Sequence, residues 1–234
     1  MQLTNFFIPA LAIPFLLLAC IVYFDAFYKG NQVKADIVAL GKSYNKIVLF
    51  SVIGYLITFC LMIFNIYKLT LLQEQEVILL SIMPAVLVYV FINTMYTDNL
   101  VKKISRQYLR VCYISQFAIG AYMINHYVGD NKKWAWIMLG IYIGIVVLLF
   151  LFATGVGASD VRIIAVLSPI QVCYVGSFAL LLTLASFILA TIYQFYRQMK
   201  VQDRKLSVPI GPPLIIPVVI AVFIAPHFGY LMNF

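Results

Sequence analysis

The sequence predicts an all-α fold, a polytopic bundle of about eight transmembrane helices. Of the 234 residues, 64% are hydrophobic and only 10% are charged, which leaves too little polar surface to cover the core of a soluble domain. The apolar residues stand in long continuous runs, whereas a transmembrane barrel would show short alternating segments. Because lipid offers the backbone no hydrogen-bond partners, such runs are expected to form helices.

The first half of the chain contains four apolar runs that are long enough to cross a membrane. They cover residues 6–24, 46–67, 77–97 and 108–127. No basic segment precedes the first run, so we expect an anchor there and not a cleaved signal peptide. Residues 25–45 carry three lysines and are expected to form a polar loop.

A long apolar stretch in the second half requires a break. After a predicted span at 134–154, residues 161–196 are apolar for about 36 residues, more than one helix needs to cross about 30 Å of hydrocarbon. Pro169 and the polar residues beside it indicate a hairpin, in which a short helix ends at residue 174 and a full helix follows it. A last span is expected at 209–232.

The positive charges predict how the helices are oriented. With the N-terminus outside and eight crossings, thirteen of the sixteen Lys and Arg residues fall in loops on the inner side. Without the hairpin, the basic segment after residue 196 would fall outside, so this count supports the hairpin as well. We therefore expect a multi-pass protein of the plasma (inner) membrane, in contact with membrane lipids. The net charge is +8, but the basic residues are scattered between apolar runs and do not indicate nucleic-acid binding.

Neither a metal site nor a disulfide framework is predicted. The four cysteines stand singly inside apolar runs, where each is expected to pack as a small hydrophobic residue. His126 and His227 lie near the expected outer ends of two spans. No Ser–His–Asp set, HExxH motif or P-loop is present.

Two aspartates are the candidate catalytic residues. Asp98 and Asp160 each lie within a few residues of a predicted helix end at the inner boundary, and they are 62 positions apart. The two helices between them return the chain to the same side, so the two carboxylates can meet. Placing an acid in such an apolar chain costs free energy unless the acid is paired, protonated or hydrated. We therefore interpret these two acids first as functional residues.

Two neighbouring carboxylates can hydrolyse a peptide bond. Repulsion leaves one proton shared between them, so one acts as a base on water while the other hydrogen-bonds the scissile carbonyl. The alternative is that each is a boundary residue offset by a nearby base, Lys102 for Asp98 and Arg162 for Asp160. Asp25 is a rival for the first acid, because it too ends a predicted helix beside a lysine.

Three segments resemble the type IV prepilin peptidase family of membrane aspartyl proteases. Residues 155–162, Gly-Val-Gly-Ala-Ser-Asp-Val-Arg, resemble that family's GxGD motif. Residues 98–104, Asp-Asn-Leu-Val-Lys-Lys-Ile, look like its first aspartate motif, and residues 208–213 look like the Pro-Phe-Gly-Pro entry to its last helix. The three occur in the family's order, so we predict a catalytic core at 77–234 and helices that complete the bundle at 1–76.

The resemblance implies an activity and a set of residues. Members of the family remove the basic leader of type IV pilin-like precursors at the cytoplasmic face, so the implied partner is such a precursor. Many bacterial members also methylate the new N-terminus with S-adenosylmethionine, and these usually carry a cytosolic insert with paired CxxC motifs. The loop at 25–45 is short and has no cysteine, so we predict cleavage without methylation and without a cofactor. The residues that carry or support the motifs are Asp98, Asp160, Gly155, Gly157, Ser159, Arg162, Lys102, Ile104, Pro209 and Gly211.

The chain departs from the family pattern at two places. Ser159 stands where the GxGD motif has its second glycine, and its hydroxyl can hydrogen-bond Asp160. Ser105 and Arg106 replace the usual Pro-Asn after Ile104.

Two other classes of function stay open. A small transporter or assembly scaffold would use the acids as proton or cation sites, near the bilayer midplane on broken helices. An intramembrane protease of the presenilin or signal-peptide-peptidase type also uses a GxGD motif. The sequence predicts neither the identity of the precursor nor the oligomeric state.

Overall fold

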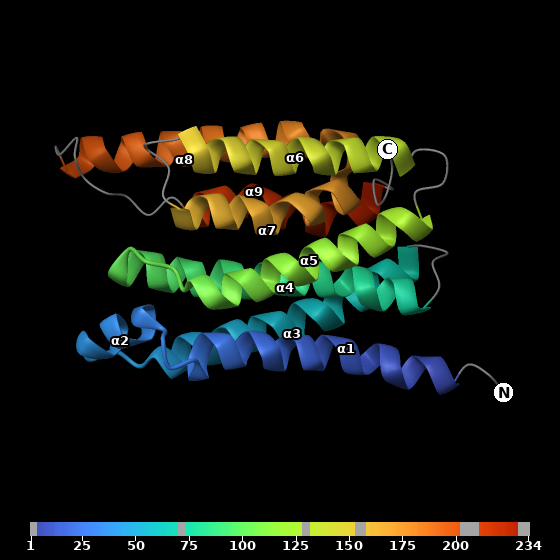
Figure 1. Ribbon diagram of the computed structural model, residues 1–234, viewed down its shortest axis with the longest axis horizontal. Coiled ribbons are helices and arrows are strands. Elements are labelled where there is room, and N and C mark those ends of the chain that lie inside the picture. The colour runs from blue at the N-terminus through green and yellow to red at the C-terminus, as the bar shows by residue number, and fades with distance from the viewer. Residues whose placement is uncertain (1–3, 70–73, 128–131, 153–157, 202–210, 229–234) are drawn as a thin grey trace.

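The computed structural model describes residues 4–69, 74–127, 132–152, 158–201 and 211–228 of the chain. Within these residues there are nine α-helices and no strand, so the predicted all-α bundle is confirmed. The axes of the long helices lie roughly along one line, and the helices stack in layers (Figure 1). The α-helices are α1 Thr4–Val22, α2 Gln32–Ala39, α3 Tyr44–Leu69, α4 Glu74–Val101, α5 Arg106–Tyr127, α6 Lys132–Phe152, α7 Ala158–Val175, α8 Ala179–Val201 and α9 Gly211–Ile224. Shorter turns are the π-helix η1 Tyr23–Phe27 and the 3₁₀ helices η3 Gly176–Phe178 and η4 Ala225–Phe228.

The predicted runs and the observed helices agree closely. The run at 77–97, for example, lies inside the longer α4. The break in the stretch 161–196 is also present, because α7 ends at Val175 and α8 begins at Ala179. The 3₁₀ turn η3 joins them, and its Gly176 has a φ of 55°, which glycine adopts without strain. The short helix and the full helix of the predicted hairpin are therefore confirmed.

The polar loop predicted at 25–45 is wrong in part, because much of this segment is helical. α1 continues into η1, and α2 follows after a bend of 54°. The Asn31 side chain caps α2 by accepting a hydrogen bond from the Lys34 backbone N–H at 3.3 Å. Val33 and Ile37 stand one turn apart and bury the same face of α2. These two apolar residues and the Asn31 cap hold the segment as a helix against the bundle.

Two helices present long apolar surfaces to their surroundings. The exposed large hydrophobic residues include Leu49, Phe50, Ile53, Ile57, Leu61 and Phe64 on α3, and Leu181, Leu184, Ile188, Ile192 and Phe195 on α8. A soluble protein rarely leaves such surfaces uncovered, so these faces indicate membrane insertion. By length and composition α3, α4 and α8 can each cross a membrane, and α1 with η1 and α2 forms a bent fourth candidate. Among the described residues, three or four of the eight predicted crossings thus meet this test.

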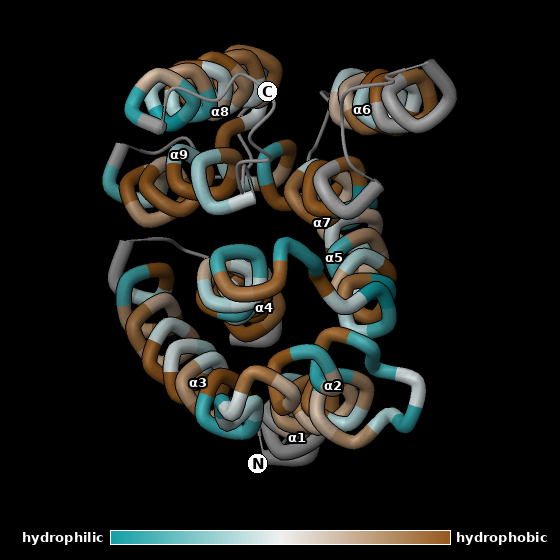
Figure 2. Tube along the Cα trace, turned by 90° about the vertical axis from the view of Figure 1, so that its left-hand side faces the viewer, coloured by the Kyte–Doolittle hydropathy of each residue, from teal (hydrophilic) through white to brown (hydrophobic). Residues whose placement is uncertain are grey.

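α4 lies at the centre of the bundle. Figure 2 shows it enclosed by α3, α5 and α9. Of its apolar 18-residue segment 78% is buried, compared with 22% for the corresponding segment of α8. Fully buried aromatic residues such as Tyr89 and Tyr108 pack in the core around it. Because α4 is central, the residues at its C-terminal end can contact several other helices.

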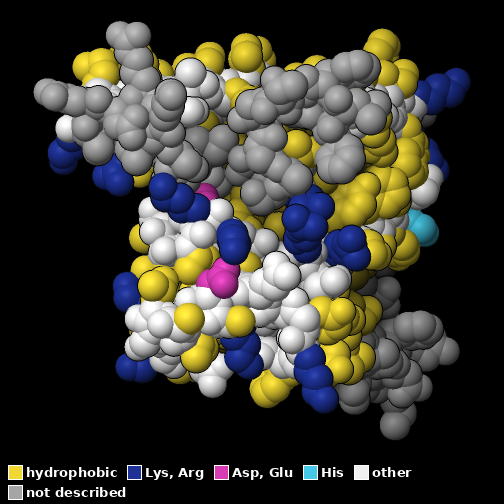
Figure 3. Space-filling model, turned by 60° about the vertical axis from the view of Figure 1, so that its left-hand side comes forward, with side chains coloured by type: hydrophobic (Ala, Val, Ile, Leu, Met, Phe, Trp, Pro, Cys, Tyr) yellow, Lys and Arg dark blue, Asp and Glu magenta, His cyan; other side chains and the backbone are white. Residues whose placement is uncertain are grey.

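The long helices alternate in direction, which collects several of the predicted site segments at one end of the bundle. α4 ends there, and α5, α7 and α9 begin there, at the left-hand side of Figure 1. Lys and Arg side chains gather on this end (Figure 3). We call it the basic end and define it by Lys102, Lys103, Arg106 and Arg162.

Candidate active site

Asp98 lies in the last turn of α4 and is nearly buried, with 8% of its surface exposed. Gly211, the first residue of α9, approaches this carboxylate closely. A Cβ atom added to Gly211 would lie 3.2 Å from Asp98 Oδ2 and 2.7 Å from Thr94 Cγ2. The Gly211 backbone N–H donates to the Asp98 carboxylate. This is the positive end of the α9 dipole, where a negative charge is stabilised.

α7 reaches the same point from another side. The Cβ atom added to Gly211 would lie 3.1 Å from Ile163 Cδ1, so α9 begins in contact with both α4 and α7. Ile163 is fully buried and stands three residues after Asp160. Because α7 begins at Ala158, Asp160 is in its first turn. The end of α4 and the beginning of α7 are therefore neighbours at the basic end.

Part of the predicted site lies outside the described residues. Gly155, Gly157 and Pro209 are in this group, and so are the side chains of Ser159 and Asp160. The separation of the Asp98 and Asp160 carboxylates therefore stays a prediction. The described backbone does place both residues on helices that meet at the same end of the bundle.

A tight turn joins α4 to α5 beside Asp98. Lys102 has a φ of 52°, a left-handed conformation that costs a residue with a Cβ atom about 1 kcal/mol or more. Its backbone N–H donates to the Asp98 carbonyl at 3.0 Å. Ile104 and Ser105 are buried, and Ile104 joins the main hydrophobic core. Lys102 thus closes α4 and Ile104 anchors the turn, so both motif residues have structural roles beside the acid.

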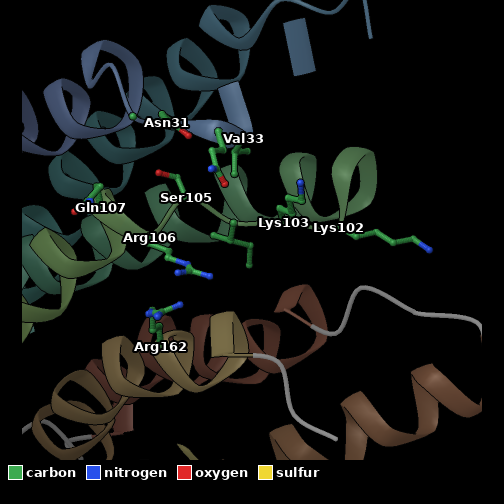
Figure 4. A pocket seen from close by; sticks show the side chains of 11 residues that line it. Asn31, Val33, Lys102, Lys103, Ser105, Arg106, Gln107 and Arg162 are labelled. Carbon is green, nitrogen blue, oxygen red and sulfur yellow. The ribbon is translucent and has the colours of Figure 1, made fainter. Parts of the chain in front are cut away.

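A cavity of about 450 Å³ opens at the basic end, beside this turn. It is lined by residues 30–33, residues 102–107 and Arg162. Arg106, at the start of α5, and Arg162, on α7, point toward one another across it (Figure 4). Partial burial, followed by the charges of Arg106 and Arg110, lowers the pKa of Arg162 from its ordinary value. The cavity is therefore a region of strong positive potential.

A second acid, Asp25, forms a buried cluster that no sequence motif revealed. It lies in η1 with no exposed surface, and its carboxylate accepts a hydrogen bond from the Tyr44 hydroxyl. It also accepts hydrogen bonds from Tyr89 and Asn93, each at 2.7 Å. Asn31 donates to the Asp25 backbone carbonyl at 2.6 Å. Asp25 is therefore not the boundary residue that was predicted, because η1 extends α1 and the neighbouring helices enclose it. The signal in the sequence was Tyr89 and Asn93, two polar side chains that stand one helical turn apart in an apolar run.

Other candidate ligands are dispersed. Among the described residues, no group of three or more His, Cys, Asp or Glu side chains is placed to hold a metal ion. Cys112 and Cys173 are buried as expected of small hydrophobic residues, whereas Cys20 and Cys60 are exposed. His126 interacts through Nδ1 with the Tyr122 carbonyl of its own helix at 2.9 Å.

No family model, curated protein or solved structure matches the chain. The most informative arrangement is the meeting of α4, α7 and α9 around Gly211. In the sequence, the motif-like segments 98–104, 155–162 and 208–213 overlap one end of each of these helices.

Proposed function

We propose that the chain is a membrane-embedded aspartyl endopeptidase of the type IV prepilin peptidase kind, which cleaves the leader peptide of a pilin-like precursor. The observation that carries this proposal is the packing at Gly211. The last turn of α4 with Asp98, the first residue of α9 and the first turns of α7 meet there. Parts of the segments with motif-like sequences are therefore neighbours in the fold, although they are far apart in the chain.

Asp98 and Asp160 form the proposed catalytic pair. With one proton between them, the ionised member removes a proton from water. The protonated member hydrogen-bonds the scissile carbonyl and later donates its proton to the leaving amine. Because the proton is shared, the pair titrates as a unit and either member can act as the base.

The precursor is proposed to lie with its apolar segment beside these helices and its leader at the basic end. Under the positive-inside rule this end faces the cytoplasm, with the chain in the plasma (inner) membrane and its N-terminus outside. Two carboxylates and a water molecule are sufficient for the hydrolysis, so the proposal includes neither a metal nor S-adenosylmethionine.

Single substitutions in the full-length chain test the pair. Asp98→Asn and Asp160→Asn are each expected to slow precursor cleavage by roughly a hundredfold or more, because each removes a proton-transfer group. Asp36→Asn is the matched control, since it removes a partly exposed acid that pairs with Lys103 at the same end. Unchanged cleavage in either test variant would remove that residue from the mechanism. Strong inhibition by a chelator would indicate a metalloenzyme instead.

The ion-site alternative has its best candidate in Asp25, because a buried acid beside a bent helix is typical of transport sites. The hydrogen bonds favour a structural role, since both carboxylate oxygens already accept from protein side chains. A transport site must also exchange its ion with solvent, and Asp25 has no exposed surface. Proton or sodium flux into vesicles that is lost in a folded Asp25→Asn variant would favour transport.

A further inference from the structure

The cavity at the basic end has the composition of an anion site. Among its lining residues are Lys102, Lys103, Arg106 and Arg162, and no Asp or Glu of the described part of the chain lines it. Lys103 has an acidic partner, because its Nζ lies 2.8 Å from Asp36 Oδ2. Within the described part of the chain, neither Arg106 nor Arg162 has such an ion pair. Among the described side chains, these two guanidinium groups therefore line the cavity without an acidic partner.

The two arginines come from different helices and face one another (Figure 4). Like charges in this arrangement repel, and the repulsion grows as solvent is excluded. A guanidinium group offers parallel N–H donors that match two oxygens of a phosphate, and a tetrahedral phosphate can present oxygens to both arginines at once. The arrangement is unfavourable when the cavity holds only water and favourable when a phosphate lies between Arg106 and Arg162.

Two helix N-termini add to the positive potential. α2 begins at Gln32 and α5 begins at Arg106, and the first residues of both helices line the cavity. The N–H groups of a first helical turn have no intrahelical acceptors, and together with the helix dipole they favour an anion. The volume of about 450 Å³ is large enough for a phosphate and part of the molecule that carries it.

We propose that this cavity binds a phosphate group between Arg106 and Arg162, supplied either by the headgroup of an anionic phospholipid or by a free phosphate. The bound anion removes the repulsion between α5 and α7 and so stabilises the basic end. This proposal requires only binding, and it stands whether or not the chain is a peptidase.

Thermal unfolding of the full-length protein in a phosphate-free neutral detergent, followed by tryptophan fluorescence, is the first test. Inorganic phosphate should raise the unfolding midpoint in a saturable way, beyond the effect of sodium chloride at equal ionic strength. In the second arm, nanodiscs with phosphatidylglycerol should raise the midpoint above that in phosphatidylcholine nanodiscs. A response to phosphate identifies a free phosphate as sufficient, and a response to phosphatidylglycerol alone identifies the lipid. Failure of both arms would overturn the proposal.

Variants locate the response. Arg106→Gln and Arg162→Gln should each raise the half-saturating concentration about tenfold, because each removes a charge-assisted contact. Lys46→Gln is the matched control, since it removes an exposed positive charge at the start of α3 outside the cavity. Its response should equal that of the wild type. If the Gln variants also respond like the wild type, the anion binds elsewhere and the proposal is wrong.

The sign of the stability change separates binding from a purely structural role. Without the anion, Arg106→Gln and Arg162→Gln should unfold at a higher temperature than the wild type, because the repulsion is relieved. At saturating anion the order should reverse. Arg162→Lys keeps the charge but not the planar fork, so it should respond more weakly than the wild type. This variant also keeps the test decisive if a Gln variant fails to fold.

Discussion

Asp25 lies in η1 among α3 and α4, whereas Asp98 lies at the end of α4 where this helix meets α7 and α9. Asp25 has no exposed surface, and its carboxylate accepts hydrogen bonds from three side chains. Asp98 keeps 8% of its surface exposed, and its carboxylate accepts from the backbone N–H of Gly211. Both acids are buried by the same bundle, but their environments suit them to different roles.

The difference teaches that burial alone does not identify a catalytic acid. A carboxylate deep in an apolar core is tolerated only when donors satisfy its oxygens, and it then joins the elements that carry those donors. Asp25 connects η1 to α3 through Tyr44 and to α4 through Asn93. Asp98 lies at a helix end beside the turn whose residues 102–107 line the cavity, and part of its surface stays exposed. Chemistry on a peptide requires the second kind of environment.

The largest expected effect separates the two acids directly. Asp25→Ala should lower the free energy of unfolding by about 3–5 kcal/mol, because it leaves three buried donors without their acceptor. Asp98→Ala should lower it by about 1 kcal/mol, the usual size of a helix-end interaction. Reversible unfolding in mixtures of a neutral detergent and dodecyl sulfate measures both values. Equal losses in the two variants would contradict the comparison.

A smaller effect is expected at the contact that holds the Asp98 region together. Gly211→Ala should lower the free energy of unfolding by about 1–3 kcal/mol, because the new Cβ atom would press on Thr94 and Ile163. Precursor cleavage should fall with it, as the Asp98 carboxylate is displaced. The control is Gly140→Ala in α6, where no heavy atom lies within 4 Å of the added Cβ atom. That variant should be more stable by up to about 1 kcal/mol. Wild-type behaviour of Gly211→Ala would show that the close approach is dispensable.

The smallest effect is expected for the exposed ion pair at the basic end. Lys103 and Asp36 are 59% and 39% exposed, so their pairing should contribute less than about 1 kcal/mol. A double-mutant cycle with Lys103→Gln and Asp36→Asn measures this coupling energy, which should decrease as salt is added. A coupling as large as the loss in Asp25→Ala would mean that solvent exposure does not distinguish these carboxylates.

The helices could be predicted from the sequence in most places, because a continuous apolar run in lipid must satisfy its own backbone. The break between α7 and α8 was predicted from the length of the apolar stretch and from Pro169, but Pro169 lies inside α7 and the break comes after Val175. α2 was missed, since Val33 and Ile37 are too few to produce a clear helical pattern. For the candidate site, the motifs pointed to Asp98 and Gly211, but no motif indicated that α9 begins so close to the Asp98 carboxylate.

Local patterns along the chain thus settle the class of the fold, the limits of most helices and the end of the bundle at which the basic residues gather. Hydropathy and helix length are properties of neighbouring residues, so they need no knowledge of packing. The enclosure of Asp25, the contact of Gly211 with two other helices and the opposition of Arg106 and Arg162 arise only when the helices pack. These contacts join residues far apart in the chain, and the interlocking of helix surfaces determines which faces meet.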